Sequence, residues 1–325
     1  MSPINAAIFI LTQNNSERKI YLKTCLYFLF KNFNKTYKYP IVILHEGDYD
    51  QHAQEEIVKS VREPFRDLIS FKEIDKTDFQ IPDHIDKEKV KQIVEIQPIP
   101  YWRNTTYRLM CNFWMNHFMK YTNGFDYVMR LDDDSIIEEP LLYDVFELMV
   151  SKKLVYMSNI IHVDCGLCNY GMKEMFENIS PEFKESLDKN KFIPGKLSEG
   201  SEHFDKFKKV VSIVEGKECT VTEFHTQMPL MYYNNFFITS TEFWNRPTVK
   251  YILEKINLHG GIFYYRYGDA PLQTLIVSLV QPEAATRAVF KYSKRLQREV
   301  FIDGNNNMHS YMPKSYDHSS CVTNK

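Results

Sequence analysis

The sequence Phe125-Asp-Tyr-Val-Met-Arg-Leu-Asp-Asp-Asp-Ser135 places a short apolar run directly before three consecutive aspartates. The run from Tyr127 to Leu131 has the length and composition of a buried strand, so the aspartates would follow its carboxyl end. Because side chains alternate between the two faces of a strand, we expect Asp132 and Asp134 to project one way and Asp133 another. Two carboxylates on one side of a strand end suit a hard divalent cation, which prefers oxygen ligands. The alternative is a solvated acidic turn, since charged runs in loops are common.

The segments before these aspartates alternate between strand-like and helix-like patterns. The apolar runs of strand length are residues 6–12, 39–45 and 68–73, and the amphipathic segments between them are residues 17–33 and 54–65. A further helical segment, residues 105–120, leads into the strand that carries the aspartates. This β-α-β-α-β order predicts a parallel sheet with right-handed crossovers, in which ligands bind beyond the carboxyl ends of the strands.

The second half of the chain is less regular. Strand-like runs and helical segments alternate at residues 141–150 (helix), 154–161 and 231–238 (strands), and 246–258 and 270–280 (helices). We expect the 246–258 helix to stop at Gly260, and Pro271 to stand just inside the start of the last helix. Residues 181–217 are polar and are expected to form helical turns and loops that cover the site. Because neither a linker nor a repeat interrupts the chain, the sequence predicts a single α/β domain over residues 1–325.

The composition argues against several classes of protein. The 325-residue chain holds 40 Lys and Arg against 42 Asp and Glu, whereas a nucleic-acid binder carries a basic surplus. No apolar run approaches the ~20 residues of a membrane helix, and the N-terminus lacks the features of a signal peptide. Cys165 and Cys168 have metal or redox spacing, but no second pair or nearby histidine completes a zinc site. We therefore expect no nucleic-acid partner and no membrane span.

Several segments, in order along the chain, resemble the fungal Golgi α-1,2-mannosyltransferases of glycosyltransferase family 15. Residues 33–44 (FNKTYKYPIVIL) are similar to the family's FNxxFxYPxVFLND strand, and residues 106–113 (TYRLMCNF) to its YRxMxRF helix. Residues 125–134 (FDYVMRLDDD) resemble YDYYWRVEPD, and residues 260–271 (GGIFYYRYGDAP) resemble GGFYYERWGDAP. Glu242-Phe-Trp244 corresponds to the family's LDFW. The resemblance covers most of the chain.

The resemblance implies a GT-A fold, with a mixed, mostly parallel central sheet flanked by helices and a Rossmann-like nucleotide-binding half. It divides the domain into a nucleotide-sugar-binding half, residues 1–140, and an acceptor-binding half, residues 141–325. The implied donor is GDP-mannose, the implied cofactor is Mn²⁺, and transfer retains the anomeric configuration. The implied site residues are Asp132 and Asp134 for the metal and diphosphate, Tyr107 and Arg108 for the donor, Asp269 near the reacting sugar, and His309 as a late metal ligand, with His318 as its rival.

Three further expectations come from the residues around these motifs. Arg130 lies in an apolar strand, so we expect it to be buried and paired with an aspartate or a phosphate, as part of the donor site. Trp102, Tyr264, Tyr265 and Tyr267 could form a platform for the acceptor sugar, because flat apolar faces suit sugar C–H surfaces; core packing is the alternative. Asp269 follows a glycine and precedes Ala270-Pro271, so it could also cap the following helix.

The chain departs from the family pattern at four positions. The arginine that ends the family's first strand is Gln13 here, which removes one cationic phosphate contact. The glutamate of the family's SNFEI segment, a candidate catalytic carboxylate, is Phe237, and two positions of its YYERW segment are Tyr265 and Tyr267. The family's membrane-anchoring stem has no counterpart, so we expect a soluble, cytoplasmic protein and leave a viral origin open.

Together these patterns predict a metal-dependent retaining glycosyltransferase that moves mannose from GDP-mannose to a hydroxyl of a glycan or glycoprotein. Since Phe237 cannot act as a nucleophile, we expect a same-face mechanism in which the leaving phosphate oxygen deprotonates the acceptor, with Asp269 orienting the acceptor or acting electrostatically. Two alternatives stay open: a non-catalytic relative that binds a nucleotide sugar or glycan, and a transferase with a different nucleotide-sugar donor.

Overall fold

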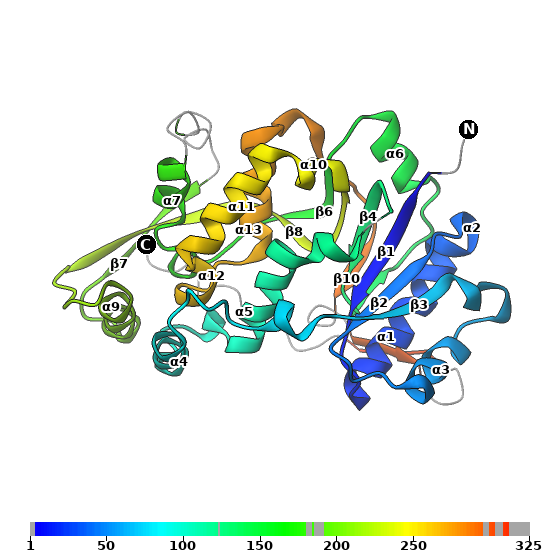
Figure 1. Cartoon of the computed structure of the whole chain (residues 1–325), viewed down its shortest axis with the longest axis horizontal. Coiled ribbons are helices and arrows are strands. Elements are labelled where there is room, and N and C mark those ends of the chain that lie inside the picture. The colour runs from blue at the N-terminus through cyan, green and yellow to red at the C-terminus, as the bar shows by residue number, and fades with distance from the viewer. Residues whose placement is uncertain are drawn as a thin grey trace.

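The structure, a computed structural model, describes residues 4–122, 124–179, 184 and 192–294, and the backbone of residues 299–302 and 308–311. Within these residues eight strands form one sheet through the middle of the molecule (Figure 1), in the order β3-β2-β1-β4-β8-β6-β9, with β7 paired to β8. The strands are β1 (Ala6–Leu11), β2 (Ile41–His45), β3 (Ile69–Glu73), β4 (Tyr127–Leu131), β6 (Tyr156–Val163), β7 (Phe192–Ser198), β8 (Glu223–Ser240) and β9 (Ala285–Arg287).

The β-α-β pattern predicted at the N-terminus is confirmed. β1 pairs in parallel with β2 and β4, and β2 pairs in parallel with β3. The connecting helices α1 (Ser16–Leu29) and α3 (Gln51–Lys59) begin where a side chain caps them: Asn15 accepts the amide proton of Arg18, and Asp50 that of Ala53. The predicted 54–65 helix ends earlier, at Lys59, and a 3₁₀ turn containing a proline at its start follows over Glu63–Leu68.

One long strand, β8, connects the two halves of the chain. It runs for 18 residues, far beyond the predicted 231–238, and pairs antiparallel with β4, β6 and β7. Strand β7 lies in the polar stretch for which turns and loops were predicted; its sequence FIPGKLS contains Pro and Gly, and its extended form comes from pairing with β8. Helix α9 (Glu202–Glu215) follows in the same stretch. The antiparallel pairs of β8 make the sheet mixed, and with the parallel pair of β6 and β9 it is mostly parallel, as predicted.

Helices cover both faces of the sheet, and the alternation of side chains along β1 divides the core into two layers. Ala6, Ile8 and Ile10 pack with α1, α3 and α6 (Val145–Ser151). Ala7 and Phe9 face the other layer, which contains residues of α4 (Lys87–Ile96), α5 (Thr105–Asn112), α7 (Met172–Ile179), α11 (Pro247–His259) and α13 (Asp269–Val280). The site-bearing strand β4 therefore lies between two apolar layers.

Local signals explain how the elements next to the site begin and end. The predicted 105–120 helix is regular only to Asn112 and continues as a π-helical turn, Phe113–His117, and a 3₁₀ turn, Phe118–Tyr121. Helix α11 ends at Gly260, whose φ of 71° is the left-handed conformation that glycine adopts readily, as predicted. Helix α13 begins at Asp269, with Pro271 in its first turn.

Short elements complete the described chain. A two-stranded ladder joins β5 (Ser135–Ile137), directly after the aspartates, to β10 (Tyr292–Lys294). A second ladder joins β11 (Glu299–Ile302) to β12 (Met308–Tyr311). The remaining helical elements are α2 (Lys35–Tyr37), α10 (Thr241–Asn245), α12 (Gly261–Tyr264), a π turn over Phe30–Asn34, and 3₁₀ turns over Lys76–Phe79, Pro100–Trp102, Leu167–Asn169 and Pro282–Ala284.

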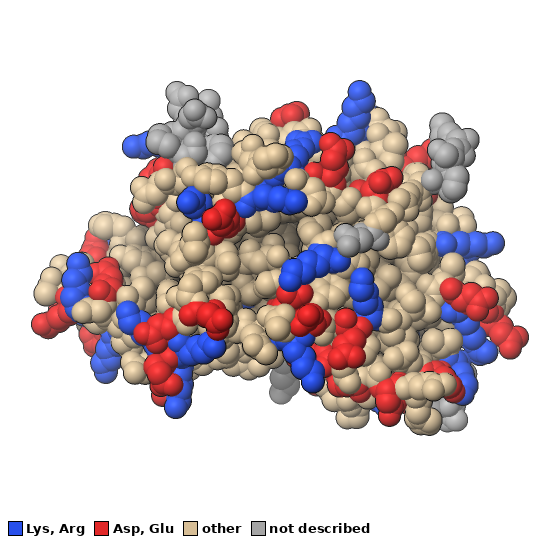
Figure 2. All heavy atoms as spheres, in the orientation of Figure 1, with Lys and Arg blue, Asp and Glu red and all other residues tan. Residues whose placement is uncertain are grey.

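Two surface properties bear on the possible partners. None of the helices in the described part of the chain has both the length and the apolar character needed to cross a membrane. On the face shown in Figure 2, acidic and basic side chains are interspersed, as the near-neutral composition would suggest.

Candidate active site

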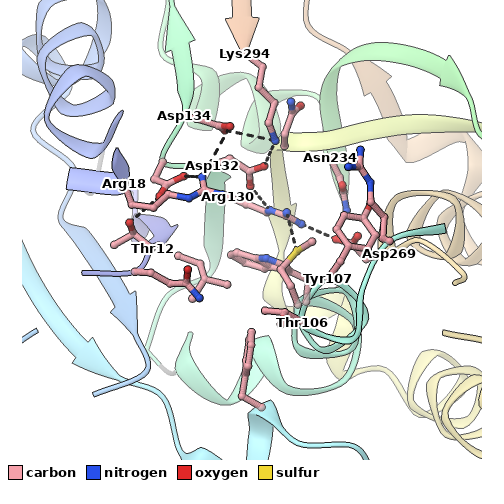
Figure 3. Close-up of a pocket in the computed structure, with 18 of the residues that line it drawn as sticks. Thr12, Arg18, Thr106, Tyr107, Arg130, Asp132, Asp134, Asn234, Asp269 and Lys294 are labelled. Carbon is pink, nitrogen blue, oxygen red and sulfur yellow. Dashed lines mark hydrogen bonds and ion pairs between the residues drawn. The ribbon is translucent and has the colours of Figure 1, made fainter. Parts of the chain in front are cut away.

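A cavity of about 440 Å³ opens beyond the carboxyl ends of β1 and β4 (Figure 3). This is the edge of the sheet at which the sequence predicted a ligand. The lining residues come from the ends of β1, β2 and β4, from the start of α5, and from β8, α13 and β10; those used below are Thr12, Gln13, Arg18, Tyr107, Trp114, Arg130, Asp132, Asp133, Asp134, Asn234, Asn235, Asp269 and Lys294.

The three aspartates are oriented as strand alternation predicted. Oδ2 of Asp132 lies 2.6 Å from Nζ of Lys294, and Oδ1 of Asp134 lies 3.5 Å from the same nitrogen. Asp133 instead accepts hydrogen bonds from the Thr12 hydroxyl and from Nη1 of Arg18, each at 2.7 Å. Asp133 and Asp134 are only 3% and 5% exposed, so the alternative of a solvated acidic turn is wrong.

Burial and neighbouring charges act in opposite directions on these carboxyl groups. Burial alone would raise the pKa of Asp132, but the positive charges of Arg130 and Lys294 outweigh it and hold that pKa below its ordinary value. Burial raises the pKa of Asp133 to about 7, and the neighbouring Asp134 adds to this increase although Arg18 opposes it. The carboxyl group of Asp132 is therefore held in its ionised form, whereas Asp133 takes up a proton more readily than an ordinary aspartate.

Arg130 connects the aspartates to the far wall of the cavity. Its side chain is 3% exposed; Nε donates to Asp132 at 2.9 Å and Nη1 donates to Oδ2 of Asp269 at 2.6 Å. The guanidinium lies 4.1 Å from the ring centre of Trp114, on which it stacks. The prediction of a buried, ion-paired arginine is confirmed.

Asp269 points into the cavity rather than capping its helix. Gly268 is the N-cap of α13 and no side chain caps that helix, so the capping alternative is wrong. Besides Arg130, the Nδ2 of Asn234 donates to Oδ2 of Asp269 at 2.7 Å. Asn235, the next residue of β8, is 4% exposed, and its Nδ2 has no hydrogen-bond partner among the described residues. This leaves one buried donor at the cavity for a ligand.

The sequence analysis missed several of these lining residues, among them Asn234, Asn235, Arg18 and Lys294. Asn234 and Asn235 are two polar residues inside an otherwise apolar strand, and that was a usable signal because buried polar groups in a strand need a partner. Arg18 and Lys294 carry no local signal. Arg18 nevertheless places a guanidinium in the same cavity that is lined by Gln13, the residue that stands where the family pattern has an arginine.

The structure separates the two predicted donor residues of α5. Tyr107 lines the cavity, with the guanidinium of Arg266 5.7 Å from its ring centre. Arg108 is fully buried and does not line the cavity. Its Nη1 donates to the carbonyl of Phe263 at 2.9 Å and its Nη2 to that of Trp102 at 3.1 Å, and burial lowers its pKa to about 9. Arg108 therefore ties α5 to α12 and does not face a ligand.

The aromatic residues predicted to bind the acceptor lie away from this cavity. None of Trp102, Tyr264, Tyr265 and Tyr267 lines it. Trp102 and Tyr267 are fully buried and Tyr265 is 8% exposed. The Tyr267 hydroxyl donates to the carbonyl of Tyr170 at 2.6 Å, and Tyr264 accepts the amide proton of Asp86. For Trp102, Tyr265 and Tyr267 the structure shows the alternative, core packing.

Two further positions concern the predicted catalytic and metal-binding groups. Phe237 is 1% exposed, with its ring 5.3 Å from that of Tyr156 and 6.4 Å from that of Trp114, so this position adds an apolar wall behind Arg130. The backbone of His309 belongs to β12, opposite Phe301, but its side chain lies outside the described residues, as does all of His318.

The donor chemistry of Asp132 and Asp134 fits a divalent cation. Their two carboxylate oxygens already converge on one positive nitrogen, that of Lys294, and oxygen donors are what Mg²⁺ and Mn²⁺ prefer. Among the described residues no group of three or more His, Cys, Asp and Glu side chains is arranged around a common point for a metal. The described part of the protein would therefore supply two carboxylates from this motif, and further ligands would come from the substrate or water.

The sequence as a whole matches known proteins. The sequence model for the family described as glycolipid 2-alpha-mannosyltransferase matches residues 2–292. Glycolipid 2-alpha-mannosyltransferase 1 of Candida albicans is 26% identical over 255 residues, covering 77% of this chain and 53% of the relative. The glycolipid 2-alpha-mannosyltransferase of Saccharomyces cerevisiae is 24% identical over 281 residues, covering 85% and 57%. The chain thus spans about half the length of these curated relatives.

Solved structures agree with this match at the level of the fold. The mannosyltransferase Ktr4p of Saccharomyces cerevisiae, crystallised with GDP, superposes with a TM-score of 0.69 at 20% identity, covering 89% of this chain and 71% of that one. Core-mannan synthase A of Aspergillus fumigatus, in a form with Mn and GDP, superposes with a TM-score of 0.70 at 19% identity, covering 90% and 75%. The α/β fold is thus that of the GT-A glycosyltransferases, and the chain belongs to glycosyltransferase family 15.

Proposed function

We propose that this protein is a retaining α-mannosyltransferase that uses GDP-mannose and Mn²⁺ and transfers mannose to a hydroxyl of a glycan or glycoprotein. The observation that carries the proposal is the convergence of Asp132, Asp134, Arg130 and Asp269 in one cavity at the carboxyl end of β4. Family membership supports the class of reaction, and relatives crystallised with GDP, or with Mn and GDP, support the donor and the cofactor.

The first chemical requirement is a place for the donor diphosphate. Asp132 and Asp134 would hold the divalent cation, which when bound offsets the negative charge that grows on the departing diphosphate. Arg18 and Lys294 bring two further positive charges to the same wall of the cavity. The unpaired amide nitrogen of Asn235 supplies a neutral donor for a phosphate or sugar oxygen.

The second requirement concerns the reacting sugar. Phe237 offers no carboxylate, so a covalent sugar intermediate on that residue is excluded. In the same-face reaction the bond between the anomeric carbon and the phosphate oxygen breaks, while the acceptor oxygen bonds to that carbon and passes its proton to the leaving phosphate oxygen. Arg130 and Asn234 hold the carboxylate of Asp269, and in this proposal that carboxylate would orient the acceptor hydroxyl or stabilise positive charge on the sugar ring.

The proposal also assigns donor binding and acceptor binding to different halves of the chain. Residues 1–140 would contribute most of the nucleotide side and residues 141–325 the acceptor side. Five residues of the second segment also line the cavity, so both segments would contribute to donor binding: Tyr233, Asn234, Asn235, Asp269 and Lys294. His309 is proposed as a further metal ligand on the strength of the family pattern.

Calorimetry with GDP, UDP and GDP-mannose, each with and without Mn²⁺, tests the donor and the cofactor, and release of GDP over time tests turnover. We expect Mn²⁺-dependent binding of GDP-mannose and slow GDP release. The variant Asp132→Asn/Asp134→Asn should lose Mn²⁺-dependent binding, whereas Asp126→Asn, exposed at the opposite end of the same strand region, should bind normally. Equal binding by both variants would contradict the proposed site, and a preference for UDP would overturn the mannose assignment.

One observation favours a second candidate, a non-catalytic relative that binds the nucleotide sugar without turnover. Phe237 stands where the family has a candidate catalytic carboxylate. Its ring packs between those of Trp114 and Tyr156, so this position supplies no carboxylate to the reaction. Tight Mn²⁺-dependent binding with no GDP release, to water or to any mannose-containing acceptor, would select this candidate.

A further inference from the structure

Lys294 occupies the position between Asp132 and Asp134 at which a metal ion is expected. Figure 3 shows its side chain reaching from β10 toward the two carboxylates. Nζ lies 2.6 Å from Asp132 and 3.5 Å from Asp134, and the side chain is 20% exposed. Among the described cations it alone pairs with both of these aspartates, because Arg130 pairs with Asp132 and Arg18 with Asp133 and Asp134.

The backbone holds Lys294 at this position. Strand β10 pairs antiparallel with β5, which begins directly after Asp134, and Lys294 is in register with Ser135. Two residues earlier in β10, the Tyr292 hydroxyl lies 2.5 Å from that of Ser135. The lysine is therefore attached to the aspartate turn through a ladder and is not a surface side chain that happens to lie nearby. It also lies beyond residues 2–292, the segment that the family model matches.

The charges around Lys294 indicate how this side chain affects the binding of a divalent cation. Lys294 lies between Asp132 and Asp134, Arg130 pairs with Asp132 at 2.9 Å and Arg18 lies 3.9 Å from Asp134, so the negative charge of the two carboxylates is already offset within the chain. A divalent cation bound by these two carboxylates would lie within a few ångströms of the Lys294 ammonium group, and like charges that close repel strongly in a partly buried site. One cation therefore has to leave. Arg130 is held by Asp269 on its other side, whereas Lys294 has a flexible four-carbon stem and reaches solvent.

We propose that Lys294 is a built-in counter-ion of the Asp132–Asp134 pair, which holds the motif together without metal and which a divalent cation must displace in order to bind. The proposal rests on the proposed function only in that it places the metal at this pair. Lys294 acts as a positioning residue: it sets the affinity of the motif for the metal, and once displaced its ammonium group remains in the cavity, where a diphosphate would meet it.

The test measures binding of Mn²⁺ alone, without nucleotide or sugar, through the loss of the free-ion electron paramagnetic resonance signal. Lys294→Met keeps the length of the side chain and removes its charge, and Lys294→Arg keeps the charge. We expect Lys294→Met to bind Mn²⁺ about tenfold more tightly than the parent protein, or better, and Lys294→Arg to bind it no more tightly than the parent. Lys291→Met is the matched control, because Lys291 lies just before β10, is 73% exposed and pairs with Glu139; its Mn²⁺ affinity should not change.

A second readout separates competition from a purely structural role. In a metal chelator Lys294→Met should melt below the parent protein, because two buried carboxylates lose their shared cation, and saturating Mn²⁺ should raise its Tm by more than it raises that of the parent. If Lys294→Met melts lower with or without Mn²⁺ and binds the ion no more tightly, Lys294 is only a structural partner and the proposal is overturned. A failure of the proposed function would appear separately, as absent GDP release in the parent protein.

Discussion

Replacing Arg130 by methionine removes the guanidinium that joins the end of β4 to the start of α13. The side chain is 3% exposed and forms two ion pairs, at 2.9 Å to Asp132 and 2.6 Å to Asp269. Asp132 keeps Lys294 as a partner, but Asp269, whose side chain is 5% exposed, keeps the neutral amide of Asn234 and the thiol of Cys111 and no cation among its ion pairs in the described part of the chain. The principal cost is therefore a buried, uncompensated carboxylate at Asp269.

Breaking a buried ion pair by removing one partner costs about 3–5 kcal/mol in the free energy of unfolding. Because the unfolding entropy is about 2.1 cal/mol/K per residue, a chain of 325 residues loses about 1.5 °C in Tm per kcal/mol, so we expect a fall of about 4–7 °C. The matched control is Lys59→Met, which breaks an exposed pair with Glu55, one helical turn away, and should leave the Tm nearly unchanged because solvent screens such a pair.

Thermal unfolding by circular dichroism, with Asp269→Asn and the double variant alongside, tests the stated cause. Asp269→Asn removes the carboxylate charge that Arg130→Met would leave buried without a cation. The double variant should therefore be more stable, by about 1–3 kcal/mol, than the sum of the two single effects predicts. The reasoning is refuted if Arg130→Met melts within the range of Lys59→Met, or if the two single effects simply add.

Three other predictions follow from buried side chains. A Cβ on Gly261 would overlap the Tyr267 ring, so Gly261→Ala should lower the free energy of unfolding in urea by about 1–3 kcal/mol. A smaller side chain at Tyr267 should restore part of this loss. If Gly261→Ala is as stable as the parent protein, the packing described here is contradicted. Burial lowers the pKa of His45, so its contribution to stability is complete above about pH 6.5 and is lost as the pH falls through its lower folded-state pKa. His45→Phe should therefore lose less unfolding free energy than the parent protein between pH 7.5 and 5.5, and an equal loss would show that other groups cause it. Arg108→Met should lower the Tm because it leaves backbone carbonyls unsatisfied, yet leave GDP affinity nearly unchanged in the folded protein; a selective loss of GDP binding would restore the donor-binding role predicted from the sequence.

Where a feature depends on neighbouring residues in the chain, the sequence analysis located it closely. The predicted strand Tyr127–Leu131 is β4 as observed, and β1, β2 and β3 lie within two residues of their predicted limits. Alternation along that strand correctly placed Asp132 and Asp134 on one side. These successes share a cause: apolar runs, the period of a strand and helix-ending glycines act over a few residues.

Features that depend on distant partners were not predicted. Strand β7 becomes extended because β8 pairs with it, although its own sequence contains proline and glycine. Arg108 and Tyr267 were predicted to bind ligands because they lie in family motifs. In the structure both side chains are buried in the core, where each donates a hydrogen bond to a backbone carbonyl. A residue type in a family motif indicates a position in the fold, but its contacts depend on which elements pack against it.

By itself, the sequence determined that a parallel α/β sheet would end in paired carboxylates suited to a divalent cation, since strand period and residue type are local properties. Only the tertiary structure decided what faces those carboxylates. Lys294 meets Asp132 from 162 residues away, and Arg18 meets Asp133 from 115 residues away. Because electrostatic contacts depend on distance in space and not on separation along the chain, the charge balance of this site emerges only when the sheet and its helices assemble.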